Sequence, residues 1–262
     1  MAKPRYKSDR KSSRRHGSKP PRTPQQESAV KAERPEPDRP VRKPPPPRRI
    51  HQGARLPEVT GLILQTPPTD DYAVLDSGNG EKLERYGPLT IRRPEGQAIW
   101  TPRLEPSQWS KVDAIFTGDT DEEGQGRWQF PNGPLDETWP LAFDGIPFYG
   151  RFTSFRHTGV FPEQAAHWHA LQSAITHARL GRPVRVLNLF GYTGLASLVA
   201  ARAGADVTHV DASKKAIGWA RENQELAGLT DKSIRWICDD AVKFCAREER
   251  REQSYDIILL DP

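Results

Sequence analysis

Three observations in the 262-residue sequence predict an α/β fold. This fold is a doubly wound parallel sheet preceded by a small β-rich region. After about residue 160 the predicted strands and helices alternate, as in proteins built from β-α-β units. Two of these strands, at 184–190 and 255–260, are almost continuously apolar, which is typical of strands covered by helices on both faces. A turn with two glycines follows the first of them and leads directly into a helix, as at the ligand-binding edge of doubly wound sheets.

Residues 1–55 differ from the rest of the chain in charge and composition. They hold 17 Lys and Arg against 5 Asp and Glu, and 11 of the 25 prolines, whereas the remaining residues hold 22 Lys and Arg against 29 Asp and Glu. A segment with so few large apolar side chains cannot offset its ordering entropy, so we expect a disordered basic tail. This tail either links and solubilises the protein or adds a salt-sensitive attraction for the phosphates of nucleic acid.

Residues 56–157 predict a small β-rich accessory domain. Short β-branched or aromatic stretches alternate with turn sequences, such as Asp-Ser-Gly-Asn-Gly at 76–80 and Pro-Asn-Gly at 131–133. Trp100, Trp109, Trp128 and Trp139 lie beside apolar stretches, so we interpret them as core residues and not as stacking platforms for bases. The expected strands are 59–65, 72–75, 89–93, 98–102, 126–130 and 147–152.

Residues 158–262 predict the doubly wound sheet element by element. Apolar residues at helical spacing favour a helix over 161–180, ended by Gly181. Because a parallel sheet that stops at its fourth strand leaves an apolar edge unpaired, we expect this sheet to be incomplete at the C-terminus and the sequence to be a fragment. After the first helix, strands are expected at 184–190, 206–211, 234–238 and 255–260, and helices at 195–203, 214–227 and 241–250.

Composition and spacing exclude several classes of protein. The sequence has neither the roughly 20-residue apolar run of a membrane span nor the apolar core of a secretory signal. Cys238 and Cys245 cannot form a disulfide framework and lack the paired spacing of a structural zinc site, so we expect a cytoplasmic protein. His167 and His169 are two positions apart on a predicted helix, where a chelating pair needs four, and no metal site is expected.

Candidate binding residues gather where the predicted strands end. Asn188 lies near the end of the first strand, and the turn Phe190-Gly191-Tyr192-Thr193-Gly194 leads into a helix whose N-terminus offers free N–H groups. Asp211 and Ala212 follow the second strand, and an acid at this position accepts hydrogen bonds from ribose hydroxyls. Since two aromatic residues occupy the positions where a pyrophosphate needs bare backbone, the turn favours an adenosine ligand without phosphates, S-adenosylmethionine, over a dinucleotide.

Acidic residues also follow the third and fourth predicted strands. Asp240 directly precedes the helix at 241–250 and is the preferred acceptor for an exocyclic adenine amine, with Asp239 as the alternative. Capping of that helix is the structural alternative for either residue. Asp261 and Pro262 follow the fourth strand.

These motifs resemble those of the class I S-adenosylmethionine-dependent methyltransferases, whose sheet is Rossmann-like. Asn-Leu-Phe-Gly-Tyr-Thr-Gly at 188–194, His-Val-Asp-Ala-Ser at 209–213 and Ile-Ile-Leu-Leu-Asp-Pro at 257–262 are most similar to the branch of the large-subunit rRNA cytosine-5 methyltransferases and its uncharacterised relatives. The segment at 155–164 is similar to the lead-in of that branch, in which a glutamine lies beside the cofactor. The resemblance covers residues 150–262 and implies that the cofactor contacts are Gln164, Asn188, Phe190, Gly191, Tyr192, Thr193, Gly194, Asp211, Ala212, Asp239, Asp240 and Asp261.

The resemblance implies an enzyme that methylates an RNA base, with cytosine-5 of rRNA as the first expectation. The catalytic cysteine of that branch lies in a part of the family beyond Pro262, so Cys238 and Cys245 are interpreted as packing residues and the catalytic residues stay unassigned. Asp261 and Pro262 begin the substrate-side motif and also fit methylation of an exocyclic amine. The alternatives are methylation of a protein side chain or small molecule, and a non-catalytic RNA-binding module that keeps the cofactor fold.

Overall fold

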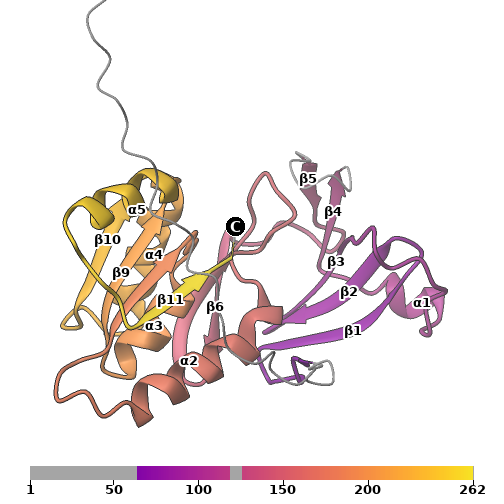
Figure 1. Cartoon of the computed structure of the whole chain (residues 1–262). Helices are drawn as coiled ribbons and strands as arrows, with labels where there is room; N and C mark the ends of the chain where they lie inside the picture. The colour runs from indigo at the N-terminus through magenta and orange to yellow at the C-terminus, as the bar shows by residue number, and fades with distance from the viewer. Residues whose placement is uncertain (1–63, 119–125, 262) are drawn as a thin grey trace, which may run out of the picture. The chain divides into compact units, whose positions relative to one another are not determined.

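The computed structural model describes residues 64–118 and 126–261 (Figure 1). The tail predicted at 1–55 and most of the strand expected at 59–65 lie outside these described residues, and Leu64 and Gln65 are not in a strand. The described strands form three sheets: β1 to β5, the pair β6 and β7, and a four-stranded sheet in the order β10-β9-β8-β11. No helix in the described ranges is long and apolar enough to cross a membrane.

The five-stranded sheet begins with a three-stranded antiparallel meander, to which β4 adds in parallel and β5 in antiparallel. Asn79 and Gly80 join the first two strands with φ values of 52° and 80°, as a two-residue hairpin turn requires. The elements are β1 (Tyr72–Gly78), β2 (Glu81–Tyr86), β3 (Leu89–Pro94), the short helix α1 (Pro106–Trp109), β4 (Ala114–Gly118) and β5 (Gly126–Gln129).

The sequence predicted some strands of this sheet and missed others. The strands expected at 72–75, 89–93 and 126–130 are present with shifted ends, but β2 and β4 were not expected. The strand expected at 98–102 is wrong, because the carbonyls of Ala98 and Trp100 instead accept hydrogen bonds from Gly80 and Asn79, the turn between β1 and β2. The core assignment of Trp100 is wrong as well, since its side chain is half exposed, whereas Trp109 and Trp139 are buried.

Strands β6 (Thr138–Phe143) and β7 (Ile146–Arg151) form a separate antiparallel hairpin. The sequence predicted β7 at 147–152 and missed β6. Trp139 and Phe148 of this hairpin belong to the same buried cluster as Leu195 and Leu198 of the α/β region. The hairpin therefore packs with the α/β region, and a domain boundary at residue 157 stays a prediction.

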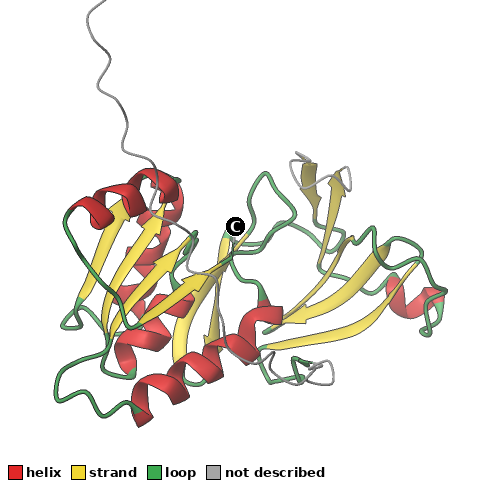
Figure 2. Cartoon of the chain, viewed as in Figure 1, coloured by secondary structure: helices red, strands yellow, loops and turns green. Residues whose placement is uncertain are grey.

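The α/β region confirms the predicted doubly wound fold (Figure 2). Its four strands are all parallel. The order in which strands are added reverses at β8, because β9 and β10 extend the sheet on one side of it and β11 on the other. The first helix ends three residues before the predicted end and starts with a 3₁₀ turn. The elements are η1 (Pro162–Gln164), α2 (Ala165–His177), β8 (Arg185–Leu189), α3 (Leu195–Arg202), β9 (Asp206–Asp211), α4 (Lys214–Leu226), β10 (Ile234–Cys238), α5 (Ala241–Arg250) and β11 (Ile257–Leu260).

Helices cover both faces of this sheet, which explains why β8 is apolar along its whole length. Val186 packs in a cluster with Leu171 of α2 and Ala200 of α3. Its neighbour Leu187 points to the other face and packs with Phe244 of α5. Successive residues of β8 are therefore buried on opposite sides, as in strands of a covered parallel sheet.

Candidate functional site

Strand register places the predicted binding residues along one edge of the parallel sheet. Leu189, the last residue of β8, pairs with Val210 on one side and with Leu260 on the other. The residues that follow these three, Phe190, Asp211 and Asp261, therefore lie at neighbouring strand ends. This edge contains the position between β8 and β11 where the strand order reverses, the usual ligand-binding position of open α/β sheets.

A cleft with about 470 Å³ of free space, including its mouth, opens at this edge, and we call it the strand-end cleft. It brings together Gln164, Asn188, Asp261 and four residues of the glycine turn. Five of the predicted residues are not among those that line it: Gly194, Asp211, Ala212, Asp239 and Asp240. The lining residues are Gly159, Val160, Phe161, Gln164, Trp168, Asn188, Phe190, Gly191, Tyr192, Thr193, Leu195, Ala196, Leu259 and Asp261.

The turn from β8 to α3 has a strained backbone. Phe190 and Tyr192 have φ values of 56° and 50°, a region that bulky residues rarely adopt. The amides of this turn hold it in place, because Gly191 N donates to the carbonyl of Val210 (3.1 Å) and Tyr192 N donates to Asp211 Oδ2 (2.9 Å). The phenyl group of Phe190 stays 41% exposed. Strain of this kind is concentrated at binding and catalytic sites.

A buried polar chain lies beneath Gly191. Asn188 Nδ2 donates to Ser197 Oγ (3.0 Å), which lies 3.0 Å from His209 Nδ1. A Cβ atom on Gly191 would lie 2.3 Å from His209 Cε1. This contact explains the glycine at position 191, because the imidazole of His209 fills the space that a side chain would need.

His209 is neutral at ordinary pH. Its side chain is fully buried, and this burial lowers the pKa of its imidazole to about 3. Its Nε2 atom has no hydrogen-bond partner among the described residues. Sequence reasoning missed His209 and Ser197, although a histidine within the apolar run of β9 was a visible signal.

Asn223 of α4 ties the glycine turn to the β6–β7 hairpin. Its Nδ2 donates to the carbonyl of Thr193 (3.0 Å), and its Oδ1 accepts from the amide of Tyr149 (2.9 Å). Thr193 Oγ1 in turn donates to the carbonyl of Gly159 (2.6 Å). The hydroxyl proton of Thr193 is therefore already used within the protein, so a ligand contact from this side chain could use its acceptor capacity alone. The sequence signal for Asn223 was an amide among the buried alanines of the helix.

Asp211 holds the turn through both carboxylate oxygens. Oδ2 accepts from Tyr192 N (2.9 Å), and Oδ1 accepts from Ser213 N (2.7 Å). Each carboxylate oxygen can accept a further hydrogen bond, so ribose binding by Asp211 stays a prediction. Burial and the nearby Asp211 charge raise the pKa of the Tyr192 phenol to about 12.

The two acids after β10 have different partners. Asp240 caps α5, since its Oδ1 accepts from Lys243 N (2.8 Å). Asp239 Oδ2 lies 2.5 Å from Arg247 Nη1, and this ion pair lowers the pKa of the Asp239 carboxyl. The backbone amide of Asp239 donates to the carbonyl of Asp211 (3.1 Å), so both acids lie at the same sheet edge as Asp211. The preference for Asp240 as the adenine contact stays a prediction.

Gln164 joins η1 to the end of β11. Its Nε2 donates to Asp261 Oδ2 (2.8 Å), and its Oε1 lies 2.7 Å from His167 Nδ1. Pro262 lies outside the described residues. His169 instead pairs with Asp144 (2.9 Å), so the two neighbouring histidines have separate partners. In the parts of the chain that the structure describes, no group of three His, Cys, Asp or Glu side chains could hold a metal ion.

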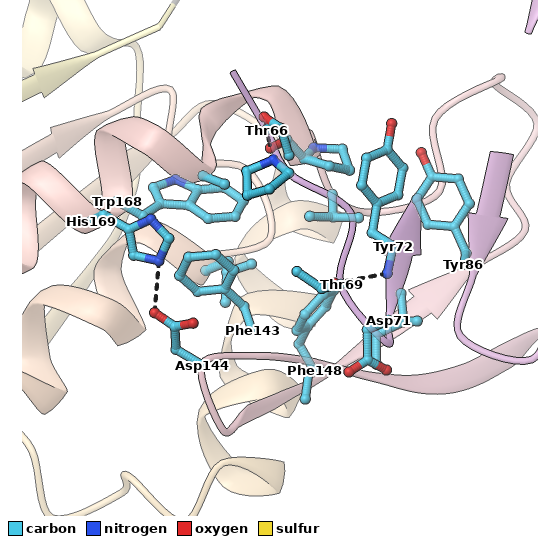
Figure 3. Close-up of a pocket in the computed structure, with 17 residues that line it drawn as sticks. Thr66, Thr69, Asp71, Tyr72, Tyr86, Phe143, Asp144, Phe148, Trp168 and His169 are labelled. Atoms are coloured by element: carbon cyan, nitrogen blue, oxygen red, sulfur yellow. Dashed lines mark hydrogen bonds and ion pairs between the residues drawn. The ribbon is translucent and has the colours of Figure 1, made fainter. Parts of the chain in front are cut away.

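A second, mostly apolar pocket lies behind the wall of the strand-end cleft (Figure 3). The two share Val160, Trp168 and Leu195. The polar groups around the apolar pocket bond to one another, as His169 does to Asp144 and Tyr72 N does to Thr69 Oγ1. We therefore assign no ligand to this pocket.

The C-terminal region matches a known family and curated relatives. The sequence model described as Conserved hypothetical protein 95 matches residues 162–262. The chain is 31% identical over 146 residues to the ribosomal RNA large subunit methyltransferase K/L of Vibrio cholerae, covering 54% of this chain and 19% of that protein. It is 34% identical over 124 residues to the enzyme of the same name from Magnetococcus marinus, covering 47% and 16%. The chain thus spans less than a fifth of the length of these relatives.

Solved structures agree with the fold. The SAM-dependent methyltransferase from Agrobacterium tumefaciens is 61% identical with a TM-score of 0.72, over 76% of this chain and 61% of that chain. A Streptococcus mutans protein described as a SAM-dependent methyltransferase has a TM-score of 0.56 at 19% identity, over 73% and 52%. These comparisons confirm the resemblance to S-adenosylmethionine-dependent methyltransferases that the sequence motifs indicated.

Proposed function

We propose that this chain belongs to an S-adenosylmethionine-dependent methyltransferase that methylates a base of RNA. The observation that carries the proposal is the strand-end cleft, because it lies at the reversal of strand order and is lined by Gln164, Asn188, the glycine turn and Asp261. The 61% identity to a SAM-dependent methyltransferase supports the same activity.

The residues at the strand ends fit the chemistry of this cofactor. The described residues that line the strand-end cleft include no Lys or Arg, which suits a ligand without phosphates. Acceptor groups surround the strand ends instead. Asp211 would accept from ribose hydroxyls, and Asp240 or Asp239 from the adenine amine. The free N-terminal amides of α3, together with Gln164, would hold the amino-acid part.

S-adenosylmethionine, when bound, supplies a methyl group that an acceptor takes by in-line displacement, while sulfur keeps the electron pair of the broken bond and the acceptor loses a proton. The contribution of the chain to such a reaction is positioning. Gln164 orients Asp261 by donating to its carboxylate, and Phe161, Phe190 and Tyr192 form apolar surface beside it.

The RNA substrate rests on the names of the curated relatives, which are rRNA large-subunit methyltransferases. We propose rRNA as the RNA, cytosine-5 as the first candidate target and the cytoplasm as the location. A second candidate is an exocyclic amine, which the exposed carboxylate of Asp261 at the end of β11 favours because it can accept an amine N–H. Mass spectrometry of nucleosides from rRNA incubated with the full-length enzyme and labelled cofactor distinguishes the two products.

The cofactor assignment is tested by calorimetric titration of S-adenosylmethionine into the Asp211→Ala variant. We expect affinity to fall about tenfold or more, since hydrogen bonds to a charged group are worth about 1.5–3 kcal/mol. Asp206→Ala is the matched control, because Asp206 starts the same strand at its opposite end and is exposed. Unchanged affinity in Asp211→Ala, or an equal loss in Asp206→Ala, contradicts the proposal.

A further inference from the structure

The strand-end cleft has one charged side chain in its lining. Among the described residues that line it, Asp261 alone is charged, and the others are glycine, apolar, aromatic or neutral polar residues. Val160, Trp168 and Leu259 belong to its apolar lining. An apolar lining lowers the local dielectric constant, so a charge acts more strongly on a ligand in this cleft than it does in bulk water.

Gln164 holds the carboxylate of Asp261 in position. Its Nε2 donates to Asp261 Oδ2 (2.8 Å), and its Oε1 lies 2.7 Å from His167 Nδ1. Because an amide oxygen can only accept a hydrogen bond, His167 Nδ1 is the donor. The two bonds together direct the NH₂ group of Gln164 towards Asp261. The negative charge is therefore held at the cleft by a neutral partner.

Asp261 also lines a larger cleft that borders β2 and β3. This cleft has about 1220 Å³ of free space including its mouth. Its cations would cancel the charge of Asp261 if they paired with it, so their partners decide whether that charge is available to a ligand. The other charged residues that line the larger cleft are Lys82, Arg93, Glu95, Arg156 and Glu163.

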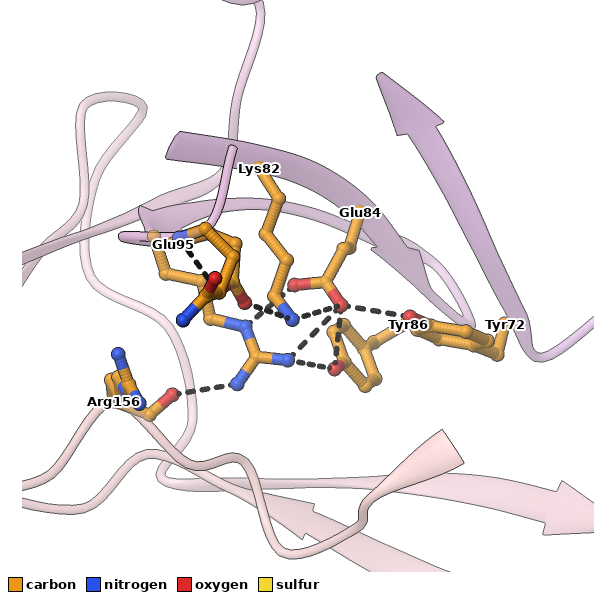
Figure 4. A network of polar contacts seen from close by, with 8 residues as sticks. Tyr72, Lys82, Glu84, Tyr86, Glu95 and Arg156 are labelled. Carbon is orange, nitrogen blue, oxygen red and sulfur yellow. Dashed lines mark hydrogen bonds and ion pairs between the residues drawn. The ribbon is translucent and has the colours of Figure 1, made fainter. Parts of the chain in front are cut away.

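The cations of the larger cleft belong to a polar network on the five-stranded sheet (Figure 4). Arg93 pairs with the buried Glu84 at 2.5 Å, and Lys82 pairs with Glu95 at 3.0 Å. Although burial opposes the effect, the hydrogen bond from Lys82 and the charge of Arg156 lower the pKa of the Glu95 carboxyl. These cations therefore act on the carboxylates of the sheet.

The charge of Asp261 is not cancelled by its surroundings. Within residues 64–118 and 126–261, no cation forms an ion pair with Asp261. Glu163 adds a further carboxylate to the larger cleft. The imidazole of His157 in that cleft is neutral, because burial and the nearby cations lower its pKa to about 4. A ligand in the strand-end cleft therefore meets a net negative charge.

A single positive charge distinguishes the cofactor from its product. S-adenosylmethionine has a positively charged sulfonium, and S-adenosylhomocysteine, which remains when the methyl group has left, has a neutral thioether in its place. The two molecules are otherwise the same, so contacts to ribose or adenine cannot distinguish them. A carboxylate in an otherwise uncharged cleft can, because specificity is a difference between two affinities.

We propose that Asp261 makes the strand-end cleft selective for the charged cofactor over the neutral product. The inference rests on the proposed function, because it takes S-adenosylmethionine as the ligand. It gives Asp261 a role in specificity that does not depend on which atom accepts the methyl group. The attraction ends when the methyl group has left, so the product binds more weakly and inhibits the enzyme less.

The test is calorimetric titration of three ligands into the full-length enzyme and its Asp261→Asn variant at pH 7. The ligands are S-adenosylmethionine, S-adenosylhomocysteine and sinefungin, an analogue in which a carbon with a protonated amine replaces the methylated sulfur. We expect the parent to bind the two charged ligands more tightly than S-adenosylhomocysteine. Asp261→Asn should lower the affinity for the charged ligands about tenfold and that for S-adenosylhomocysteine less than about twofold. In 1 M salt, where the Debye length is about 3 Å, the preference of the parent should shrink.

Asp206→Asn is the matched control, because it removes one exposed carboxylate from the opposite end of β9. It should bind all three ligands with parental affinity. Asp261→Asn keeps an oxygen that can accept from Gln164, so its retained affinity for S-adenosylhomocysteine shows that the variant folds. An equal loss for all three ligands, or an unchanged preference, overturns the inference. A loss for sinefungin alone also overturns it, because Asp261 then accepts an N–H and does not respond to charge.

The outcomes separate this inference from the cofactor assignment. If Asp211→Ala loses affinity for S-adenosylmethionine while Asp261→Asn keeps the parental preference, this inference alone is overturned. If the parent does not bind S-adenosylmethionine, the proposed function is overturned together with it.

Discussion

The strands of the parallel sheet bury apolar and neutral polar side chains, whereas the strands of the five-stranded sheet also bury charged ones. Around β8, Val186, Leu187 and Leu189 pack with apolar neighbours. The five-stranded sheet instead encloses the ion pair of Glu84 and Arg93, whose residues are 0% and 5% exposed. The interior of the parallel sheet can be recognised in the sequence as the apolar run of β8. The ion pair of the five-stranded sheet can be recognised only in the structure, where the two charged side chains lie side by side.

This difference explains where the predictions of secondary structure were accurate. The strands β9 and β10 and the helix α5 begin and end at the predicted residues. Strand β2 reads Glu-Lys-Leu-Glu-Arg-Tyr and was missed, because a buried glutamate looks like a surface residue in the sequence. Strand β2 forms because it pairs with its neighbours β1 and β3, and its own residues show no strand pattern.

The largest expected effect tests the polar interior. Glu84→Ala leaves the Arg93 guanidinium buried without its partner, and loss of one side of a buried ion pair costs about 3–5 kcal/mol. We expect the free energy of unfolding, measured by urea denaturation, to fall by that amount. The double variant Glu84→Leu/Arg93→Met should regain most of it, because apolar residues then replace both charges.

The control for Glu84 lies on the same strand. Glu81 pairs with Arg92 at a partly exposed position, so Glu81→Ala should cost less than about 1 kcal/mol. Equal losses in Glu81→Ala and Glu84→Ala would show that burial of the charge does not set the stability of this sheet.

An intermediate effect is expected from His209 in the parallel sheet. Its folded-state pKa, about 3, lies below the ordinary value of 6.5, so the unfolded chain binds the proton more tightly. Its contribution to stability is full above pH 6.5 and is lost as the pH falls from 6.5 towards 3, by about 3 kcal/mol between pH 6.5 and pH 4.

The measurement is the free energy of unfolding between pH 7 and pH 4 for the parent and for His209→Gln. The variant should lose less stability over this range, because glutamine takes up no proton. Parallel curves for the two proteins would contradict a neutral buried imidazole.

The smallest effect distinguishes the two acids after β10. Asp240→Ala removes the cap of α5 and should cost about 1 kcal/mol of stability. Asp240→Asn keeps an oxygen for the cap and should cost less. If Asp240 also contacts adenine, both Asp240 variants bind S-adenosylmethionine more weakly in calorimetry. If only Asp239→Asn binds it more weakly, Asp239 is the adenine contact.

In the candidate site, too, some residues could be predicted from local sequence patterns, whereas others act through tertiary contacts. The glycine turn, Asp211 and Asp261 could be located because each directly follows an apolar strand, and parallel strands end at one edge. The roles of Asn223, Ser197 and His209 could not be found in this way. Each acts through partners that are distant in the sequence, as Asn223 does with Tyr149 and Thr193.

The sequence by itself determined the doubly wound sheet, the order of its elements and the edge at which binding residues gather, because apolar periodicity and glycine turns are local properties. Tertiary structure alone decided how that edge is supported. It placed the imidazole of His209 beneath Gly191, and the Arg93–Glu84 pair against the segment that carries Arg156 and His157. These contacts depend on burial of polar groups between distant segments, and the free energy of such burial depends on partners that only folding brings together.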